Sequence, residues 1–238
     1  MIEGKTVLGI IPARGGSKGL PGKNTKLLCG KPLIGWSIEK AKKSRYLDLT
    51  LVTTDNREIA EISSKLGAYV PFLRPAELAS DTSTTLEAVV HALEYLAEKE
   101  NRTFDIIVLL EPTSPLREDD DIDKMLEKYI NVEDQFDSIV SIGEVDEHPA
   151  IVKRVVDNSL EPFCPELMQT TRRQDNEPAY FPYGVAYMVK TKALLAEKTF
   201  YTKRCTYYRL KRYQNFEIDS IYDFLCIENI MKYEWGLE

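Results

Sequence analysis

Three cations and four glycines crowd into one stretch near the start of the chain, residues 12–24, which read PARGGSKGLPGKN. Glycine lets backbone N–H groups turn toward a ligand, because it has no Cβ in the way. Arg14, Lys18 and Lys23 place positive charge beside those donors. A loop of this composition predicts an anion site, and an oligophosphate suits it best.

Two common phosphate-binding motifs do not match this loop. A Walker A loop needs Ser or Thr after its lysine, whereas Lys23 is followed by Asn24, and the dinucleotide fingerprint G-x-G-x-x-G is absent. Residues 15–19 do match the G-x-S-x-G nucleophile elbow, which would make Ser17 the nucleophile of a serine hydrolase. An elbow turns at once into a helix, and Pro21 prolongs the loop instead. The hydrolase stays as an alternative, as does a plain flexible surface loop.

A buried strand is expected to carry the loop, because an apolar run over 7–11 ends there. Further apolar runs predict strands over 49–53, 68–72, 106–110, 138–142 and 183–189. Between and after them, helical spacing and capping patterns predict helices over 32–44, from 55 to about 66, over 84–96, from 119–121 onward, and over 221–233. Such alternation predicts an α/β fold with a doubly wound, mainly parallel sheet.

Two polar pairs are expected to cap helices: Asp55 with Glu58, and Thr84 with Glu87. The alternation of strands and helices breaks down over 145–180, where short strands with a turn at 157–158 and a charged loop are expected. We therefore predict a single domain, 1–238, with 145–180 as a small inserted lobe.

The totals exclude several classes of function. A net charge of −7 over 238 residues argues against nucleic acid as a partner. No stretch approaches the roughly 20 apolar residues of a membrane span, and we expect no membrane partner. The four cysteines form no C-x-x-C pair, and the first residues run into a strand without a leader pattern. These features predict a cytoplasmic protein with free thiols that binds a small anionic ligand.

Polar residues follow other predicted strands and are expected to face the same crevice, because ligands of open α/β sheets bind at the carboxyl ends of their strands. Arg74 and Ser83 lie in one polar segment, although both could be plain surface residues and Ser80 could replace Ser83. Glu111, Thr113 and Ser114 directly follow the strand over 106–110, where the last two could instead cap the turn.

Two carboxylates, Glu217 and Asp219, are separated by one residue. If their segment is a strand, both side chains face the same way. Together they could hold Mg²⁺, a hard cation that takes carboxylate and phosphate oxygens. The alternative is a pair of exposed acids before a helix.

These motifs together resemble the acylneuraminate cytidylyltransferases, the CMP-sialic acid synthetases. The resemblance spans nearly the whole chain, from the loop over 12–24 and the GKPLIGWSI that follows it, through TTD (53–55), LRPAELASDTS (73–83), LLEPTSPLR (109–117) and RRQD (172–175), to FEIDS (216–220).

The resemblance implies a nucleotidyltransferase of Rossmann-like fold that transfers CMP from CTP to a nonulosonic, sialic-acid-like sugar acid and releases pyrophosphate. It implies Mg²⁺ as cofactor and a homodimer in which the lobe over 145–180 reaches the partner's site. By the same resemblance the nucleotide is bound by Arg14, Gly15, Ser17, Lys18, Lys23, Asn24, Arg74 and Ser83. The sugar acid is bound by Glu111, Thr113, Ser114, Arg173 and Tyr187, the metal by Asp219 and Glu217, and the catalytic residues are Arg14, Lys23 and Asp219.

Three positions depart from the family pattern, and two of them, at 111 and 183, put the identity of the sugar in doubt. Glu111 stands where the family usually has Gln, and a carboxylate accepts hydrogen bonds but cannot donate them. Glu217 replaces the first Asp of an Asp-x-Asp pair, and Tyr183 precedes Gly184 where Asn-Gly is common. Tyr187 could equally be a core tyrosine, and Arg173 could lie in a charged dimer contact. An enzyme for a 3-deoxy-octulosonic acid and a non-catalytic, nucleotide-binding regulatory protein remain alternatives.

Overall fold

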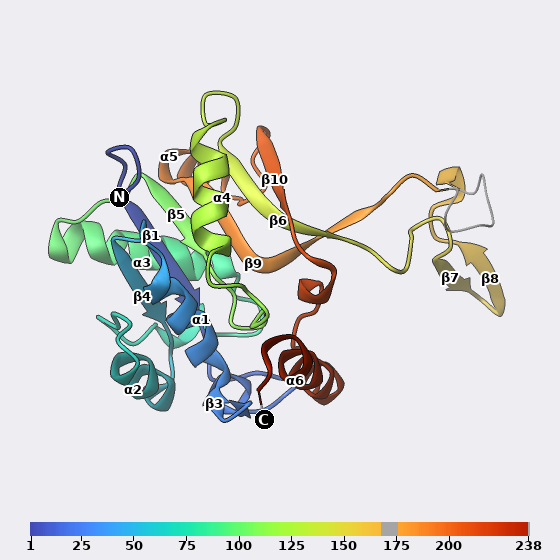
Figure 1. The fold of residues 1–238 in the computed structure, drawn as a ribbon, viewed down its shortest axis with the longest axis horizontal. Coiled ribbons are helices and arrows are strands. Elements are labelled where there is room, and N and C mark those ends of the chain that lie inside the picture. Colours follow the sequence, from blue (N-terminus) through green and yellow to red (C-terminus); the bar gives the residue numbers. More distant parts are fainter. Residues whose placement is uncertain (168–175, 238) are drawn as a thin grey trace.

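A six-stranded sheet, in the order β10-β6-β9-β5-β1-β4, forms the centre of the molecule (Figure 1). The computed structural model describes residues 1–167 and 176–237. Strand β1 pairs in parallel with β4 and β5, and β10 pairs in parallel with β6, while β9 runs antiparallel between β5 and β6. The strands are β1 (Val7–Pro12), β4 (Leu49–Thr53), β5 (Ile106–Leu109), β6 (Ser138–Glu144), β9 (Tyr180–Lys190) and β10 (Cys205–Arg209). The predicted mainly parallel α/β fold is confirmed.

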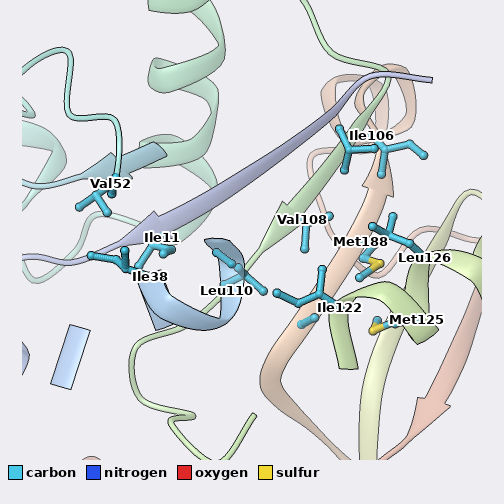
Figure 2. Packing of buried hydrophobic residues seen from close by; sticks show 14 of the residues in the cluster. Ile11, Ile38, Val52, Ile106, Val108, Leu110, Ile122, Met125, Leu126 and Met188 are labelled. Atoms are coloured by element: carbon cyan, nitrogen blue, oxygen red, sulfur yellow. The ribbon is translucent and has the colours of Figure 1, made fainter. Parts of the chain in front are cut away.

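Helices cover both faces of this sheet. Because the side chains of a strand point alternately to its two sides, each strand can pack against helices on both faces. Val7 and Ile11 of β1 pack in one core cluster with α1 (Leu33–Lys43), α2 (Arg57–Lys65) and α4 (Asp121–Ile130), part of which Figure 2 shows. Leu8 and Ile10 pack in a second cluster with α3 (Thr85–Glu100) and α5 (Thr191–Glu197). Strand β1 is therefore apolar on both sides, as expected for a buried parallel strand.

The C-terminal helix α6 (Ile221–Trp235) packs beside α1 in a third core cluster, where the ring centroids of Trp36 and Trp235 lie 5.7 Å apart. Because α6 lies against α1, it holds the segment before it, residues 215–220, close to the loop after β1. This docking brings an early loop and a late segment of the chain together at one site.

Local signals at the helix starts were correct at one position and wrong at another. Thr84 and Glu87 form the predicted capping box of α3. Asn56, not Asp55, caps α2, accepting from the Ile59 N–H at 3.1 Å. The strand predicted over 68–72 is reduced to an isolated bridge between Leu51 and Tyr69.

Strands β6 and β9 lead into a hairpin that stands away from the body of the protein (Figure 1). It consists of β7 (Lys153–Val156) and β8 (Ser159–Pro162), with Asp157 at φ 51° in the predicted turn. Short strands β2 (Leu27–Leu28) and β3 (Lys31–Pro32) form a further hairpin before α1. Among the described residues, no helix has both the length and the apolar character needed to cross a membrane.

Candidate active site

A cavity of about 450 Å³ lies where the loop after β1 meets residues 74–85 before α3, the exit loop of β5 and Asp219. Its lining contains most of the predicted site residues: Arg14, Ser17, Lys18, Lys23, Asn24, Arg74, Ser83, Glu111, Thr113 and Asp219. Gly15, Ser114, Tyr187 and Glu217 are described but are not part of this lining. Arg173 lies outside the described residues. The fold therefore brings together segments that are up to about two hundred residues apart in the chain.

The cations at the mouth of the cavity share one acidic partner, Asp81. Arg14 donates to the Ser80 carbonyl at 3.0 Å and to Asp81 Oδ1 at 3.2 Å, and Lys18 Nζ lies 2.7 Å from Asp81 Oδ2. Lys18 and Arg14 hold the pKa of the Asp81 carboxyl below its usual range. The Asp81 carboxylate thus pairs with two cations that could instead pair with a phosphate group.

Two partly buried contacts shape the loop that carries these cations. The side-chain amide of Asn24, itself buried, donates to the Arg14 carbonyl at 3.0 Å. The Gly15 N–H donates to Asp55 Oδ1 at 2.9 Å, which explains why Asp55 does not cap α2. Gly15 has no room for a side chain either, because a Cβ would lie 2.9 Å from the Asn56 amide. The loop is therefore held by the exit of β4.

Lys23 connects the same loop to the segment before α6. Its side chain is only 12% exposed, and Nζ donates to the Ile218 carbonyl at 2.6 Å and lies 3.2 Å from Asp219 Oδ1. The Ile218 N–H in turn donates to the Thr113 carbonyl at 2.8 Å. One lysine and one backbone bond thus join three loops around the cavity.

Arg74 and Ser83 both stabilise the loop that faces the cations. The Arg74 guanidinium is buried and donates to the Thr53 carbonyl at 2.5 Å and to the Leu78 carbonyl at 3.3 Å, and burial lowers its pKa. The Ser83 hydroxyl donates to the Glu77 carbonyl at 2.6 Å. Both side chains still line the cavity, so they offer polar atoms at a fixed position.

Two carboxylates, Glu111 and Glu217, meet at the exit of β5. A Cβ on Gly184 would lie 2.7 Å from Glu111 Oε2 and 2.9 Å from Glu217 Oε1, so only glycine fits between them. Burial, then repulsion from Glu217, raises the pKa of Glu111 to about 7, and Asp219 adds to the repulsion. This end of the cavity therefore carries an excess of negative charge, in contrast to the mouth.

The segment of Glu217 and Asp219 is not the strand considered from sequence, because residues 215–218 have no strand pairing. The two carboxylates have different partners: Glu217 Oε1 accepts from Ser114 Oγ at 2.8 Å and from the Gly184 N–H at 2.6 Å, whereas Asp219 pairs with Lys23. Both are hard oxygen donors beside a cavity that also holds the cationic loop.

A separate acidic group, Glu118, Asp120 and Asp121, has its ligand atoms within 4.8 Å of one another. These carboxylates already accept hydrogen bonds within the protein. Asp121 accepts from the Glu118 N–H at 2.7 Å and from Gln214 at 2.6 Å, and Lys124 lies 2.7 Å from Asp120. The cluster thus connects the start of α4 to the segment after β10.

Arg117 is a residue whose role the sequence did not indicate. Its fully buried guanidinium donates to the carbonyls of Val185 at 2.5 Å, Gly184 at 3.0 Å and Glu111 at 3.4 Å, and to Ser37 Oγ at 3.0 Å. Burial lowers its pKa to about 10. Nothing local marks this arginine as buried, because its acceptors come from β9, α1 and the β5 exit loop.

Tyr187 lies in the core, only 8% exposed, with its ring centroid 6.2 Å from that of Phe200 and 5.8 Å from that of Tyr201. Burial, followed by the charge of Glu111, raises the pKa of the Tyr187 hydroxyl. Its ring therefore lies near the acidic end of the site, behind the residues that line the cavity.

The sequence profile of a family described as "Cytidylyltransferase" matches residues 8–234. A CMP-N,N'-diacetyllegionaminic acid synthase of Legionella pneumophila is 35% identical over 228 residues, which cover 95% of this chain and 96% of the relative.

The chain belongs to the cytidylyltransferase family.

Other curated relatives of this cytidylyltransferase differ in the sugar acid that their names specify. A pseudaminic acid cytidylyltransferase of Campylobacter jejuni is 34% identical and covers 90% of this chain and 91% of the relative. An N-acylneuraminate cytidylyltransferase of Streptococcus agalactiae is 32% identical over 96% of this chain but only 54% of the relative. The enzyme class, a nucleotidyltransferase, is therefore established.

Solved structures support the fold of this cytidylyltransferase. A CMP:2-keto-3-deoxy-manno-octonic acid synthetase complexed with CTP superposes with a TM-score of 0.70 at 16% identity, covering 96% of this chain and 99% of that chain. A cytidylyltransferase from Leptospira borgpetersenii gives a TM-score of 0.62 at 19% identity, covering 96% of this chain and 87% of that chain. The elbow geometry required of a hydrolase is missing, because Ser17 is followed by bends and a 3-10 turn at Lys23–Thr25 before any α-helix.

Proposed function

We propose that this cytidylyltransferase transfers CMP from CTP to a nonulosonic acid and releases pyrophosphate. The observation that carries the proposal is the polarity of one cavity, which is cationic at Arg14 and Lys18 and acidic at Glu111 and Asp219. A nucleoside triphosphate fits the cationic end, and the hydroxyl groups of a sugar acid can donate hydrogen bonds to the carboxylate oxygens at the other end. The names of the relatives support the same pair of substrates.

In the proposed reaction a hydroxyl oxygen of the sugar acid attacks the α-phosphorus of CTP. The bond from that phosphorus to the bridging oxygen breaks, pyrophosphate leaves, and the hydroxyl proton is released. Arg14 and Lys23 neutralise the charge that develops on the transferring and leaving phosphates. Arg74 and Ser83 hold the nucleotide from the segment before α3, and the cavity keeps the two substrates together.

We further propose Mg²⁺ as cofactor, with Asp219 and Glu217 as its protein ligands. The donor set fits, because carboxylate and phosphate oxygens are the ligands that Mg²⁺ prefers. Asp219 lines the same cavity as the cationic loop, and Glu217 lies beside Glu111 at the exit of β5. When bound, the cation would supply charge neutralisation for the phosphates.

A homodimer is proposed from the surface of the hairpin β7–β8. Val155 and Leu160 face each other across its two strands, and each is 73% exposed. Phe163, just beyond β8, is 60% exposed. A two-stranded hairpin is marginally stable alone, so an apolar surface on it is best explained by a second copy that covers it.

We also propose a cytoplasmic location, since Cys29, Cys164, Cys205 and Cys226 are all free thiols.

The decisive experiment incubates the protein with CTP, Mg²⁺ and a panel of sugar acids and measures pyrophosphate release. We expect turnover with a legionaminic, pseudaminic or neuraminic acid. Turnover confined to a 3-deoxy-octulosonic acid would replace the acceptor, while tight CTP binding without turnover on any acid would favour a regulatory protein. Labelling by a serine-directed phosphonate that is lost in Ser17→Ala would restore the hydrolase.

A further inference from the structure

Ser114 lies behind the cavity rather than on its wall. Its side chain is 1% exposed and is not part of the cavity lining, although Glu111 and Thr113 on the same loop are. Its hydroxyl donates to Glu217 Oε1 at 2.8 Å across 103 residues of sequence. A hydroxyl in this position contacts the side chain of a proposed metal ligand and lies off the cavity wall.

Glu217 Oε1 receives a second hydrogen bond from the Gly184 N–H at 2.6 Å. Two donors on one oxygen fix the orientation of the carboxylate, and neither of these bonds uses Oε2. The donors are themselves held. The Ser114 N–H donates to the Glu111 carbonyl at 3.2 Å, and the Gly184 carbonyl accepts from Arg117 at 3.0 Å.

The neighbouring backbone fixes the same segment. The Ile218 N–H donates to the Thr113 carbonyl at 2.8 Å, so residues 113 and 114 of one loop bond to residues 217 and 218 of the other. Partners that orient a metal-binding carboxylate typically change metal affinity about 10- to 100-fold when they are removed.

We propose that Ser114 is a positioning residue that orients the Glu217 carboxylate for the divalent cation, and that it does not bind the sugar. This inference rests on the proposed function and deepens it. It gives the Ser114 hydroxyl the role of orienting a metal ligand, in place of a direct contact with the sugar.

The test titrates Mn²⁺ into protein saturated with CTP, without any acceptor, and follows binding by electron paramagnetic resonance against a blank of CTP alone. We expect Ser114→Ala to weaken Mn²⁺ binding about 10- to 100-fold. Its affinity for CTP without metal and its KM for the sugar acid at saturating metal should stay within about twofold. Ser63→Ala is the matched control, because the Ser63 hydroxyl is equally buried, in α2, and has no partner among the described residues.

A second variant separates positioning from a general loss of structure. If Ser114 acts only through Glu217, its removal in a Glu217→Gln background should cost less than about twofold in Mn²⁺ affinity, since contacting residues of one network are non-additive. An additive loss would overturn the proposal, as would unchanged Mn²⁺ binding in Ser114→Ala or a rise confined to the KM of the sugar. Wild-type protein that turns over CTP but binds no Mn²⁺ would overturn the metal site and this inference while leaving the transferase intact.

Discussion

The Cα of Gly19 faces the main-chain carbonyl oxygen of Asp219 so closely that a Cβ would stand well inside the 3.0 Å that Cβ atoms keep from other atoms. The cationic loop after β1 and the acidic segment before α6 are therefore in direct backbone contact at this point. An added side-chain atom could be accommodated only by moving one of the two backbones, which is energetically costly. Lys23 joins the same two segments a few residues further along.

This contact predicts that Gly19→Ala displaces the two loops from each other. Because a misplacement of about 1 Å can cost about 100-fold in rate, we expect kcat/KM for CTP to fall between about 10- and 100-fold. Thermal unfolding should shift by the equivalent of about 1–3 kcal/mol, as overpacking does elsewhere. Gly16→Ala is the control, since its Cβ would meet nothing within 4 Å. Equal activity of the two variants would contradict the steric argument.

Arg14 should matter for activity far more than for stability. Its side chain is 34% exposed and its ion pair with Asp81 is at the surface, where such pairs contribute at most about 1 kcal/mol. Removing a charge-stabilising donor costs about 100- to 1,000-fold in kcat, and we expect Arg14→Ala to do so. Steady-state kinetics and thermal melting measure the two effects, with the exposed Arg57→Ala of α2 as reference. A melting temperature that collapses together with the rate would make Arg14 a structural residue.

Asp81 should compete with the nucleotide, because it pairs with Arg14 and Lys18 at the mouth of the cavity. Asp81→Asn keeps the shape and removes the charge, so we expect the Kd for CTP to fall about two- to tenfold, the range that exposed ion pairs allow. Isothermal calorimetry at constant ionic strength measures the change. Glu94→Gln, which removes one exposed charge from α3, should leave Kd unchanged. Weaker binding in Asp81→Asn would mean that the carboxylate contacts the nucleotide.

Asp137 should make stability depend on pH in the acid range. Hydrogen bonds from Arg204 at 2.7 Å and Lys190 at 3.0 Å lower its pKa to about 2. A lowered pKa in the folded state stabilises the protein above the ordinary pKa of about 4, and this contribution disappears as pH falls from there toward 2.

Urea unfolding at a series of pH values tests this dependence. Asp137→Asn should be less stable than wild type at pH 7, and the difference between the two should shrink as pH falls from about 4 to about 2. The exposed neighbour Asp134→Asn is the control. A difference that stays constant across this range would show that the Asp137 charge does not stabilise the fold.

We predict that a substitution in the hairpin β7–β8 can prevent dimer formation without changing the stability of the fold. Leu160→Lys places a charge in the middle of the exposed apolar pair with Val155, and we expect it to convert the protein to a monomer in sedimentation experiments. Ser159→Lys adds the same charge one position away and should leave the dimer intact. Because both residues are exposed and far from the core, neither should change the melting temperature by more than about 2 °C.

Local patterns were sufficient where neighbouring residues alone determine a structure. The capping box of Thr84 and Glu87 and the turn at Asp157 depend on contacts a few residues apart, and both were predicted correctly. The cap at residue 55 was wrong because Asp55 has a tertiary partner, the Gly15 N–H, which no local pattern reveals. Strand β10 was missed because Tyr207 and its neighbours lie at an edge of the sheet, half exposed, without a long apolar run.

By itself, the sequence determined most of the long helices and buried strands, the cationic loop of residues 12–24 and the membership of one family, because periodicity and motif spacing are local quantities. Only the tertiary structure decided that β9 runs antiparallel in the middle of the sheet, that Arg117 is buried, and that Ser114 contacts Glu217 and not the cavity. These features depend on which distant backbone groups need a hydrogen-bond partner once the chain is packed, and that need arises only when water is excluded.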